Sequence, residues 1–269
     1  MEQPLTVSTD LHTHTRFSPD ARNSPHEMCQ QAMKLGLKAI AFTEHVEWHP
    51  SWRQLAPDFP AYWKAIEECR REFGPQGLTV LSGIELGNPS EHLQEANRIM
   101  GELPFDLIVG SVHWIYDINI HERHLFSGRE AYSVYGDYFA KIEEMALTVE
   151  LTFVAHFDRI FAAGVPANGQ FEPARIEGQI RRTLAAIAGR GQALELNTRF
   201  LAHRPNWNLA LLTMYRWFRE EGGKHVVVNS DAHNIHQLAR NFDIAEKLLA
   251  DAGYDAVGLP QVESATNAP

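Results

Sequence analysis

The sequence predicts an α/β fold: a single-domain barrel of parallel strands with helices between them. Seven strand-like apolar runs alternate with helical segments, and this alternation is typical of a parallel sheet. A length of 269 residues, with 44% hydrophobic and 22% charged residues, suits one domain with a substantial core. Metal-capable side chains repeatedly follow the strands, at the end of a barrel where functional residues collect.

The expected strands are short apolar runs that cover residues 6–11, 37–42, 78–84, 105–112, 150–155, 192–196 and 225–229. Helices are expected over 27–34, 61–73, 90–100, 131–146, 175–188, 207–221 and 235–252. Ser24, Pro25 and Glu27 form a helix start, while Gly36 and Gly253 follow helix ends.

Two connections are too long for ordinary βα loops, residues 47–60 and 114–128, and we expect both to face a substrate. The exposed-looking aromatic residues Trp48, Trp52, Tyr62 and Trp63, in the first loop and at the start of the helix after it, could close a pocket or pack against a partner, and the oligomeric state stays open. The barrel domain is expected over residues 1–258, followed by a flexible C-terminal tail over 259–269.

Composition excludes several classes of protein. The formal charge of −10 argues against a binder of nucleic-acid polymers, although an anionic substrate is possible if bound cations reverse the local field. Cys29 and Cys69 match no CxxC or zinc-finger spacing, so a disulfide framework is not expected. No basic and apolar leader and no membrane-length apolar stretch is present, so the expected location is the cytoplasm.

Nine metal-capable side chains follow the predicted strands. They are His12, His14, Asp20, His45, Glu85, His113, His156, Asp231 and His233. Because the carboxyl ends of parallel strands open on one face of a barrel, these side chains should converge at one mouth. A divalent cation would compensate the desolvation of Glu85 and Asp231, and a carboxylate can bridge two ions. Mixed imidazole and carboxylate ligands without cysteine favour Zn²⁺, Mn²⁺ or Fe²⁺.

The sequence offers little support for other catalytic motifs. There is no GxSxG elbow, no GxxxxGK[ST] loop and no GxGxxG after the first strand, so serine hydrolase, P-loop and dinucleotide functions are not indicated. His121 and His124 lie in the 114–128 loop and could touch the substrate. Ordinary surface or satisfied positions are expected for His26, His49, His92, His203, His225 and His236.

Taken in order, the motifs DLHTHTRFSPDA, FTEH, SGIELG, GSVHW, AHFDRI, LELNT and NSDAH span nearly the whole chain. Through this ordered set of motifs the chain resembles the PHP (polymerase and histidinol phosphatase) metallophosphoesterases, most closely the histidinol-phosphatase type. The resemblance implies a distorted (β/α)7 TIM-like barrel, a single domain with a trinuclear site of three divalent ions.

The resemblance also implies how the ligands are shared. His12, His14, Glu85 and Asp231 would hold a first metal, and Glu85 would bridge to a second metal completed by His113 and His156. Asp20, His45 and His233 would hold the third, with Asp20 standing where many relatives have histidine. Cations roughly 3.5 to 4 Å apart would acidify a bridging water, and the resulting hydroxide would attack phosphorus in line.

Arginine suits a phosphate clamp because its planar fork binds two oxygens at once. The candidates are Arg159 after the fifth strand, Arg199 after the sixth strand, and Arg16 beside the HxH motif; each could equally form a surface ion pair. Glu44 and Asp158 adjoin ligands and could orient them, and Asp158 could equally act as a general acid.

The resemblance implies a metal-dependent phosphomonoesterase, with L-histidinol phosphate, hydrolysed to L-histidinol and phosphate in histidine biosynthesis, as the best single substrate. One departure bears on that substrate. Histidinol phosphatases of this family continue NTxGLR after the sixth strand, whereas residues 197–205 read NTRFLAHRP.

Three alternatives stay open at this point. A PHP phosphoesterase could act on nucleotides or nucleic-acid ends. An amidohydrolase barrel also begins with HxH, but commonly carries a bridging modified lysine after the fourth strand, where this chain has His113. A catalytically silent metal-binding module is a different class altogether, and the full ligand set argues against it.

Overall fold

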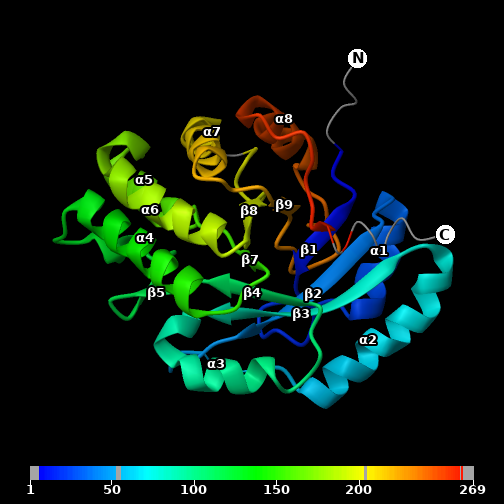
Figure 1. Ribbon diagram of the computed structural model, residues 1–269. Coiled ribbons are helices and arrows are strands. Elements are labelled where there is room, and N and C mark those ends of the chain that lie inside the picture. The colour runs from blue at the N-terminus through cyan, green and yellow to red at the C-terminus, as the bar shows by residue number, and fades with distance from the viewer. Residues whose placement is uncertain (1–5, 53–55, 203–204, 261, 263–269) are drawn as a thin grey trace.

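The computed structural model describes residues 6–52, 56–202, 205–260 and 262, and its strands form one parallel barrel (Figure 1). The seven-stranded sheet has the order β1–β2–β3–β4–β7–β8–β9, so neighbouring strands follow one another along the chain. Their bounds are β1 (Thr9–Thr13), β2 (Ala39–Val46), β3 (Thr79–Gly87), β4 (Leu107–Ser111), β7 (Phe153–Val154), β8 (Ala193–Asn197) and β9 (Val226–Asn229). All seven expected strands are confirmed.

The barrel is nearly closed between its first and last strands. A single parallel bridge joins Thr13 to Ala232, and the backbone N–H of His14 donates to Ala232 O at 2.8 Å. The expected α/β class and distorted (β/α)7 TIM-like architecture are therefore confirmed.

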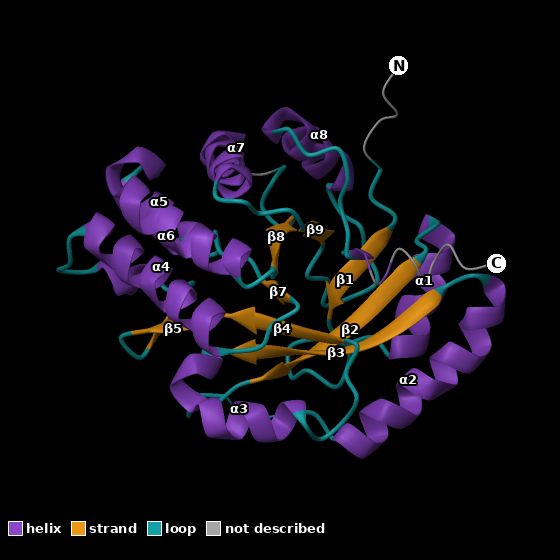
Figure 2. Ribbon diagram, in the orientation of Figure 1, coloured by secondary structure: helices purple, strands orange, loops and turns teal. Residues whose placement is uncertain are grey.

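Helices surround the strands (Figure 2). They are α1 (Pro25–Leu35), α2 (Phe59–Phe73), α3 (Leu93–Met100), α4 (Ala131–Thr148), α5 (Phe161–Asn168), α6 (Glu177–Gly189), α7 (Pro205–Glu220) and α8 (Phe242–Ala252), with 3₁₀ turns at Gly74–Gln76, Pro89–His92, Arg123–Phe126 and Pro173–Ile176. At α1 the expected start is a capping box: the Glu27 carboxylate accepts from Ser24 N at 2.8 Å, and Glu27 N donates to Ser24 Oγ at 3.3 Å.

Two helix predictions need correction. Helix α5 was not expected; its sequence is apolar all round and contains Pro166, so it shows no amphipathic period. The helix expected over 235–252 begins only at Phe242, because residues 235–241 form turns and Asn241 has φ 55°. The loop over 114–128 contains a hairpin of β5 (Trp114–Ile115) and β6 (Ile118–Asn119).

The barrel interior is apolar towards the amino ends of the strands. Its buried cluster consists of Leu11, Ala39, Ala41, Leu107, Val109, Phe153, Ala155, Ala193 and Val227, together with Leu259 and Val262. Leu259 and Val262 are each 3% exposed, so the first part of the expected tail is packed and any flexible part begins later. Residues 261 and 263–269 lie outside the described residues, and the boundary at 258 stays a prediction.

No helix within the described ranges has the length and apolar character needed to cross a membrane.

Candidate metal centre

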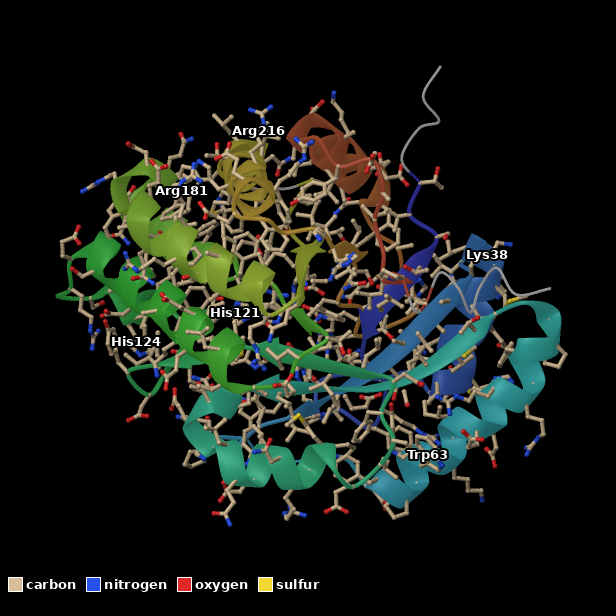
Figure 3. The ribbon with its side chains drawn as sticks, viewed as in Figure 1. Lys38, Trp63, His121, His124, Arg181 and Arg216 are labelled. Carbon is tan, nitrogen blue, oxygen red and sulfur yellow. The ribbon has the colours of Figure 1, made fainter. Side chains whose placement is uncertain are left out.

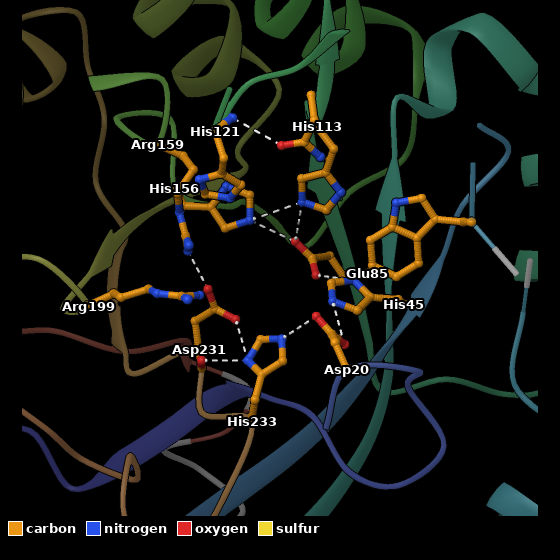
Figure 4. Close-up of a pocket in the computed structure, with 12 residues that line it drawn as sticks. Asp20, His45, Glu85, His113, His121, His156, Arg159, Arg199, Asp231 and His233 are labelled. Atoms are coloured by element: carbon orange, nitrogen blue, oxygen red, sulfur yellow. Dashed lines mark hydrogen bonds and ion pairs between the residues drawn. The ribbon is translucent and has the colours of Figure 1, made fainter. Parts of the chain in front are cut away.

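The carboxyl ends of the strands enclose a cavity of about 200 Å³ (Figure 4). It is lined by Asp20, His45, Trp52, Glu85, His113, Asn119, His121, His156, Arg159, Arg199, Asp231 and His233. His12 and His14 have no exposed surface and lie within ion-pair distance of Glu85 and Asp231. The structure therefore brings all nine predicted ligand residues together.

Glu85 on β3 is the centre of the cluster, and its side chain is 1% exposed. One carboxylate oxygen, Oε1, lies 2.7 Å from His156 Nε2 and 3.3 Å from His113 Nε2. The other oxygen, Oε2, has three imidazole neighbours: His45 Nδ1 at 2.9 Å, His12 Nε2 at 3.3 Å and His14 Nε2 at 3.4 Å. A single carboxylate thus faces five imidazoles from four segments of the chain, as a bridging ligand would.

Asp231 and Asp20 complete the other side. Asp231 Oδ1 lies 3.3 Å from His14 Nε2 and 3.5 Å from His233 Nδ1, and the residue has φ 51°, which is rare for a non-glycine residue. The two oxygens of Asp20 face His233 Nε2 at 3.1 Å and His45 Nε2 at 3.6 Å. Asp20 therefore reaches the same two histidines with which it was grouped.

The two buried carboxylates of the site, Glu85 and Asp231, have strongly lowered pKa values. Burial alone would raise the pKa of Glu85, but His12, His45 and His113 hold it well below its usual range. Burial likewise raises the pKa of Asp231, and Arg159 with the nearby histidines outweighs it. Both carboxylates are therefore ionised in the metal-free protein and available as ligands.

The donor set fits divalent cations. Several buried polar atoms of this cluster have no hydrogen-bond partner among the described residues: His12 Nε2, His14 Nε2, His45 Nδ1, His156 Nδ1 and Glu85 Oε2. Buried polar atoms are normally paired, and ion coordination would satisfy those that face the cluster. In the same part of the chain, four overlapping groups have ligand atoms within 4.8 Å of one another: His14–His45–His233, His12–His14–Asp231, His12–Glu85–His156 and His45–Glu85–His113. The chain thus holds candidate metal-binding groups.

A family model of the PHP domain matches residues 10–199, a range that includes six of the seven motifs. The chain belongs to the PHP domain family. The expected family membership is confirmed by this match.

Relatives of this PHP domain are named as phosphatases. A histidinol-phosphatase of Lactococcus lactis is 27% identical over 91% of this chain and 91% of its own length. A probable histidinol-phosphatase of Deinococcus radiodurans is 27% identical over 93% of this chain and 95% of its own. A crystal structure of the Lactococcus lactis histidinol phosphate phosphatase, complexed with Zn, L-histidinol and phosphate, has TM-score 0.83 at 24% identity, covering 94% of this chain and 96% of that one. This likeness shows the fold.

The three candidate arginines of the PHP domain differ in position. Arg159 is 3% exposed, lines the cavity and donates from Nη2 to Asp231 Oδ2. Arg199 also lines the cavity, so the altered segment after β8 still supplies an arginine there. Arg16 is exposed, lies beside the Phe17 ring and does not line the cavity. Its role in phosphate binding stays a prediction without support from this geometry.

The two carboxylates expected to orient ligands also differ. Glu44 is fully buried and accepts from Ser18 Oγ at 2.6 Å, and Ser18 Oγ lies 3.3 Å from His14 Nδ1, so Glu44 reaches a predicted ligand through one hydroxyl. Burial raises the pKa of Asp158 to about 6, but Asp158 does not line the cavity. Its action as a general acid stays a prediction, because the geometry does not bring it to the cavity wall.

Sequence reasoning missed three residues of this PHP domain. Glu195 lies against His12 Nδ1 and Glu47 against His113 Nδ1, in each case the ring nitrogen that faces away from Glu85. Glu195 stands two residues before Asn197 on β8, and Glu47 stands two residues after His45, just past the end of β2; this spacing of two is the signal that could have found them. The cavity lining also includes Trp52, one of the aromatic residues expected to close a pocket or pack against a partner, and it adds Asn119, which lies in the 114–128 loop but was not singled out.

The remaining histidines divide as follows. His121 lines the cavity, whereas His124 is exposed at the periphery and pairs with Glu122 at 3.0 Å (Figure 3). None of the described histidines expected in ordinary positions lines the cavity: His26, His49, His92, His225 and His236. His203 lies outside the described residues.

Proposed function

We propose that this protein hydrolyses L-histidinol phosphate to L-histidinol and phosphate as a metal-dependent phosphomonoesterase of histidine biosynthesis, acting in the cytoplasm. One observation carries the proposal: two partly or fully buried arginines and a cluster of imidazoles and carboxylates line the same small cavity. Metal-dependent phosphoester hydrolysis combines these two components side by side, an anion clamp and a cation centre. The names of the relatives support histidinol phosphate as the substrate.

We assign nine residues to three divalent ions, Zn²⁺, Mn²⁺ or Fe²⁺. His12, His14, Glu85 and Asp231 would hold the first, Glu85 with His113 and His156 the second, and Asp20, His45 and His233 the third. Imidazole and carboxylate donors in mixture suit these ions better than Ca²⁺ or Mg²⁺. When bound, the ions supply Lewis acidity, acidify a water molecule for attack on phosphorus and neutralise charge on the phosphoryl oxygens.

The arginines would bind the phosphoryl group. Both guanidinium groups point toward Asp231 at one wall of the cavity (Figure 4). Burial lowers the pKa of Arg199, and the nearby charge of Arg159 lowers it further. A phosphate dianion between the two would relieve this repulsion, and each planar fork can donate two hydrogen bonds to it.

The organic part of the substrate would meet residues from the two long loops. Trp52 belongs to the loop over 47–60, and Asn119 and His121 belong to the loop over 114–128. The Trp52 ring packs edge-on against His45, with ring centroids 5.1 Å apart. A cavity of about 200 Å³ suits a small monoester.

The test is phosphate release from L-histidinol phosphate, p-nitrophenyl phosphate and a nucleoside monophosphate, with protein reconstituted in Zn²⁺ or Mn²⁺. The proposal predicts a kcat/KM of about 10⁴ M⁻¹s⁻¹ or more for L-histidinol phosphate, well above the other two esters. Equal and slow hydrolysis of all three would reject this substrate and keep the phosphoesterase. Preference for the nucleotide would support the alternative PHP activity, and no hydrolysis with metals bound would support the silent module.

A further inference from the structure

Glu195 on β8 is a fully buried carboxylate that lies beneath the cavity without lining it. We propose that Glu195 is a positioning residue of the metal centre, which sets the tautomer of His12 and holds the backbone at His156. The inference rests on the metal centre of the proposed function and adds a residue that contacts neither the substrate nor the ions.

Both oxygens of Glu195 act as acceptors. Oε1 lies 2.7 Å from His12 Nδ1 and accepts from Asn229 Nδ2 at 2.9 Å. Oε2 accepts from the backbone N–H of His156 at 2.7 Å and from Asn197 Nδ2 at 3.3 Å. A backbone N–H and two amide groups can only donate in these contacts, so the position requires a group that accepts on both sides.

This arrangement decides which nitrogen of His12 is free. Nδ1 donates to the Glu195 carboxylate and keeps its proton, so Nε2 is the nitrogen that would give up its proton and become bare when a metal binds. Nε2 points at the centre, 3.3 Å from Glu85 Oε2 and 3.8 Å from Asp231 Oδ1, and has no hydrogen-bond partner among the described residues. A metal ligand must present such a bare nitrogen.

Glu195 also lies at the seam of the barrel. Between β1 and β9 there is one bridge rather than a continuous ladder of hydrogen bonds. Across this seam Asn229 Oδ1 accepts from Leu11 N at 2.8 Å, and its Nδ2 donates to Glu195, which also binds His12 on β1. One carboxylate thus ties β1, β8, β9 and the segment after β7 together below the ligands.

The substitution Glu195→Gln tests this role because it keeps the size of the side chain and replaces one acceptor oxygen by an NH₂ group. If the NH₂ faces His12, Nδ1 must accept and the proton moves to Nε2, where it competes with the metal. If the NH₂ faces the backbone N–H of His156, two donors face each other and neither has an acceptor. Either way zinc affinity should fall by about 10- to 100-fold, as for other residues that orient metal ligands.

Zinc affinity is measured without substrate, by competition with a chromogenic chelator, alongside thermal melting of the metal-free protein and the visible spectrum of its Co²⁺ form. The matched control is Glu246→Gln, which alters a carboxylate on α8 that accepts from Val7 N at 2.7 Å, away from the cavity. The inference predicts weaker zinc binding and an altered Co²⁺ spectrum in Glu195→Gln alone, with phosphatase turnover recovered at saturating zinc. Zinc affinity and spectrum equal to those of the control would overturn it.

A purely structural role would lower the metal-free melting temperature and leave turnover depressed at saturating zinc, and this result would also overturn the inference. If Glu195→Gln does not fold, the imidazole ¹H–¹⁵N spectrum of zinc-loaded wild type decides. A proton on Nδ1 of His12 supports the inference and a proton on Nε2 rejects it. Because the zinc-affinity, Co²⁺ and imidazole spectra use no phosphate ester, failure of the substrate assignment is seen separately in the hydrolysis assay.

Discussion

Replacing Arg159 by methionine is the most informative single perturbation of the cavity. Arg159 is buried, its Nη2 donates to Asp231 Oδ2, and its guanidinium lines the cavity beside Arg199 (Figure 4). Methionine keeps an apolar stem, ends short of the guanidinium group, and removes the charge and the donors. The proposed function therefore predicts a loss of transition-state stabilisation with the metals retained.

The magnitude follows from the bonds that the fork can make. A hydrogen bond to a charged group contributes about 1.5–3 kcal/mol. At about 1.4 kcal/mol for each factor of ten, one lost bond to a phosphoryl oxygen lowers kcat/KM by about 10- to 150-fold. A bidentate clamp loses more, toward the 10²- to 10³-fold, or about 2.7–4 kcal/mol, typical of a lost transition-state donor.

The assay is phosphate release from L-histidinol phosphate, with bound zinc measured on the same samples. Metal content should stay unchanged, because removing Arg159 also removes a cation that competes with metals for Asp231. Arg199→Met should show a similar but smaller loss, since Arg199 is less buried. Arg16→Met should keep wild-type kcat/KM, because this side chain lies outside the cavity lining. Unchanged kcat/KM in Arg159→Met, or a larger loss in Arg16→Met, would refute the reasoning.

The other predictions concern the ligands, the metals and the packing. Glu85→Gln and Asp231→Asn should each lose activity by about 10³-fold or more while far-UV circular dichroism stays native, and wild-type turnover in either would contradict the ligand assignment. Chelation should lower the midpoint of thermal unfolding, and added zinc should restore it, because bound ions stabilise only the folded state. Zinc uptake should release protons and strengthen with pH: burial lowers the pKa of His113, but Glu47 and Glu85 raise it to about 9, so the ligand holds a proton at neutral pH that zinc must displace. Titration of zinc into weakly buffered protein with an indicator dye measures the released protons. A zinc affinity that is constant with pH would contradict the prediction. Leu259→Ala should cost about 2–5 kcal/mol in urea unfolding, whereas a negligible cost would support a flexible tail from residue 259.

The strands and the convergence of ligands could be predicted because both depend on local patterns. Each apolar run has the length and residue types of a buried strand, and each ligand follows such a run, so parallel pairing alone brings the ligands to one mouth. His12 and His14 needed no long-range information, since a spacing of two residues places both on one face of an extended chain.

The features that could not be predicted from the sequence depend on tertiary contacts. A spacing of two could single out Glu195 and Glu47, but only the folded barrel shows that they contact His12 and His113. Arg16 and Asp158 adjoin predicted ligands in sequence, but neighbours along the chain point in different directions, and neither lines the cavity. Helix α5 carries no amphipathic period because it is apolar on all sides, and the start of α8 depends on the backbone of Asn241 rather than on hydrophobic spacing.

The central claim is that nine side chains from separate strand ends form one multinuclear metal centre. Anomalous diffraction at the zinc edge, from crystals grown with zinc, tests it most directly. The account predicts three anomalous peaks, all within the cluster around Glu85, with ligands drawn from the nine residues and no others. A single peak, or peaks bound away from Glu85 and Asp231, would contradict it.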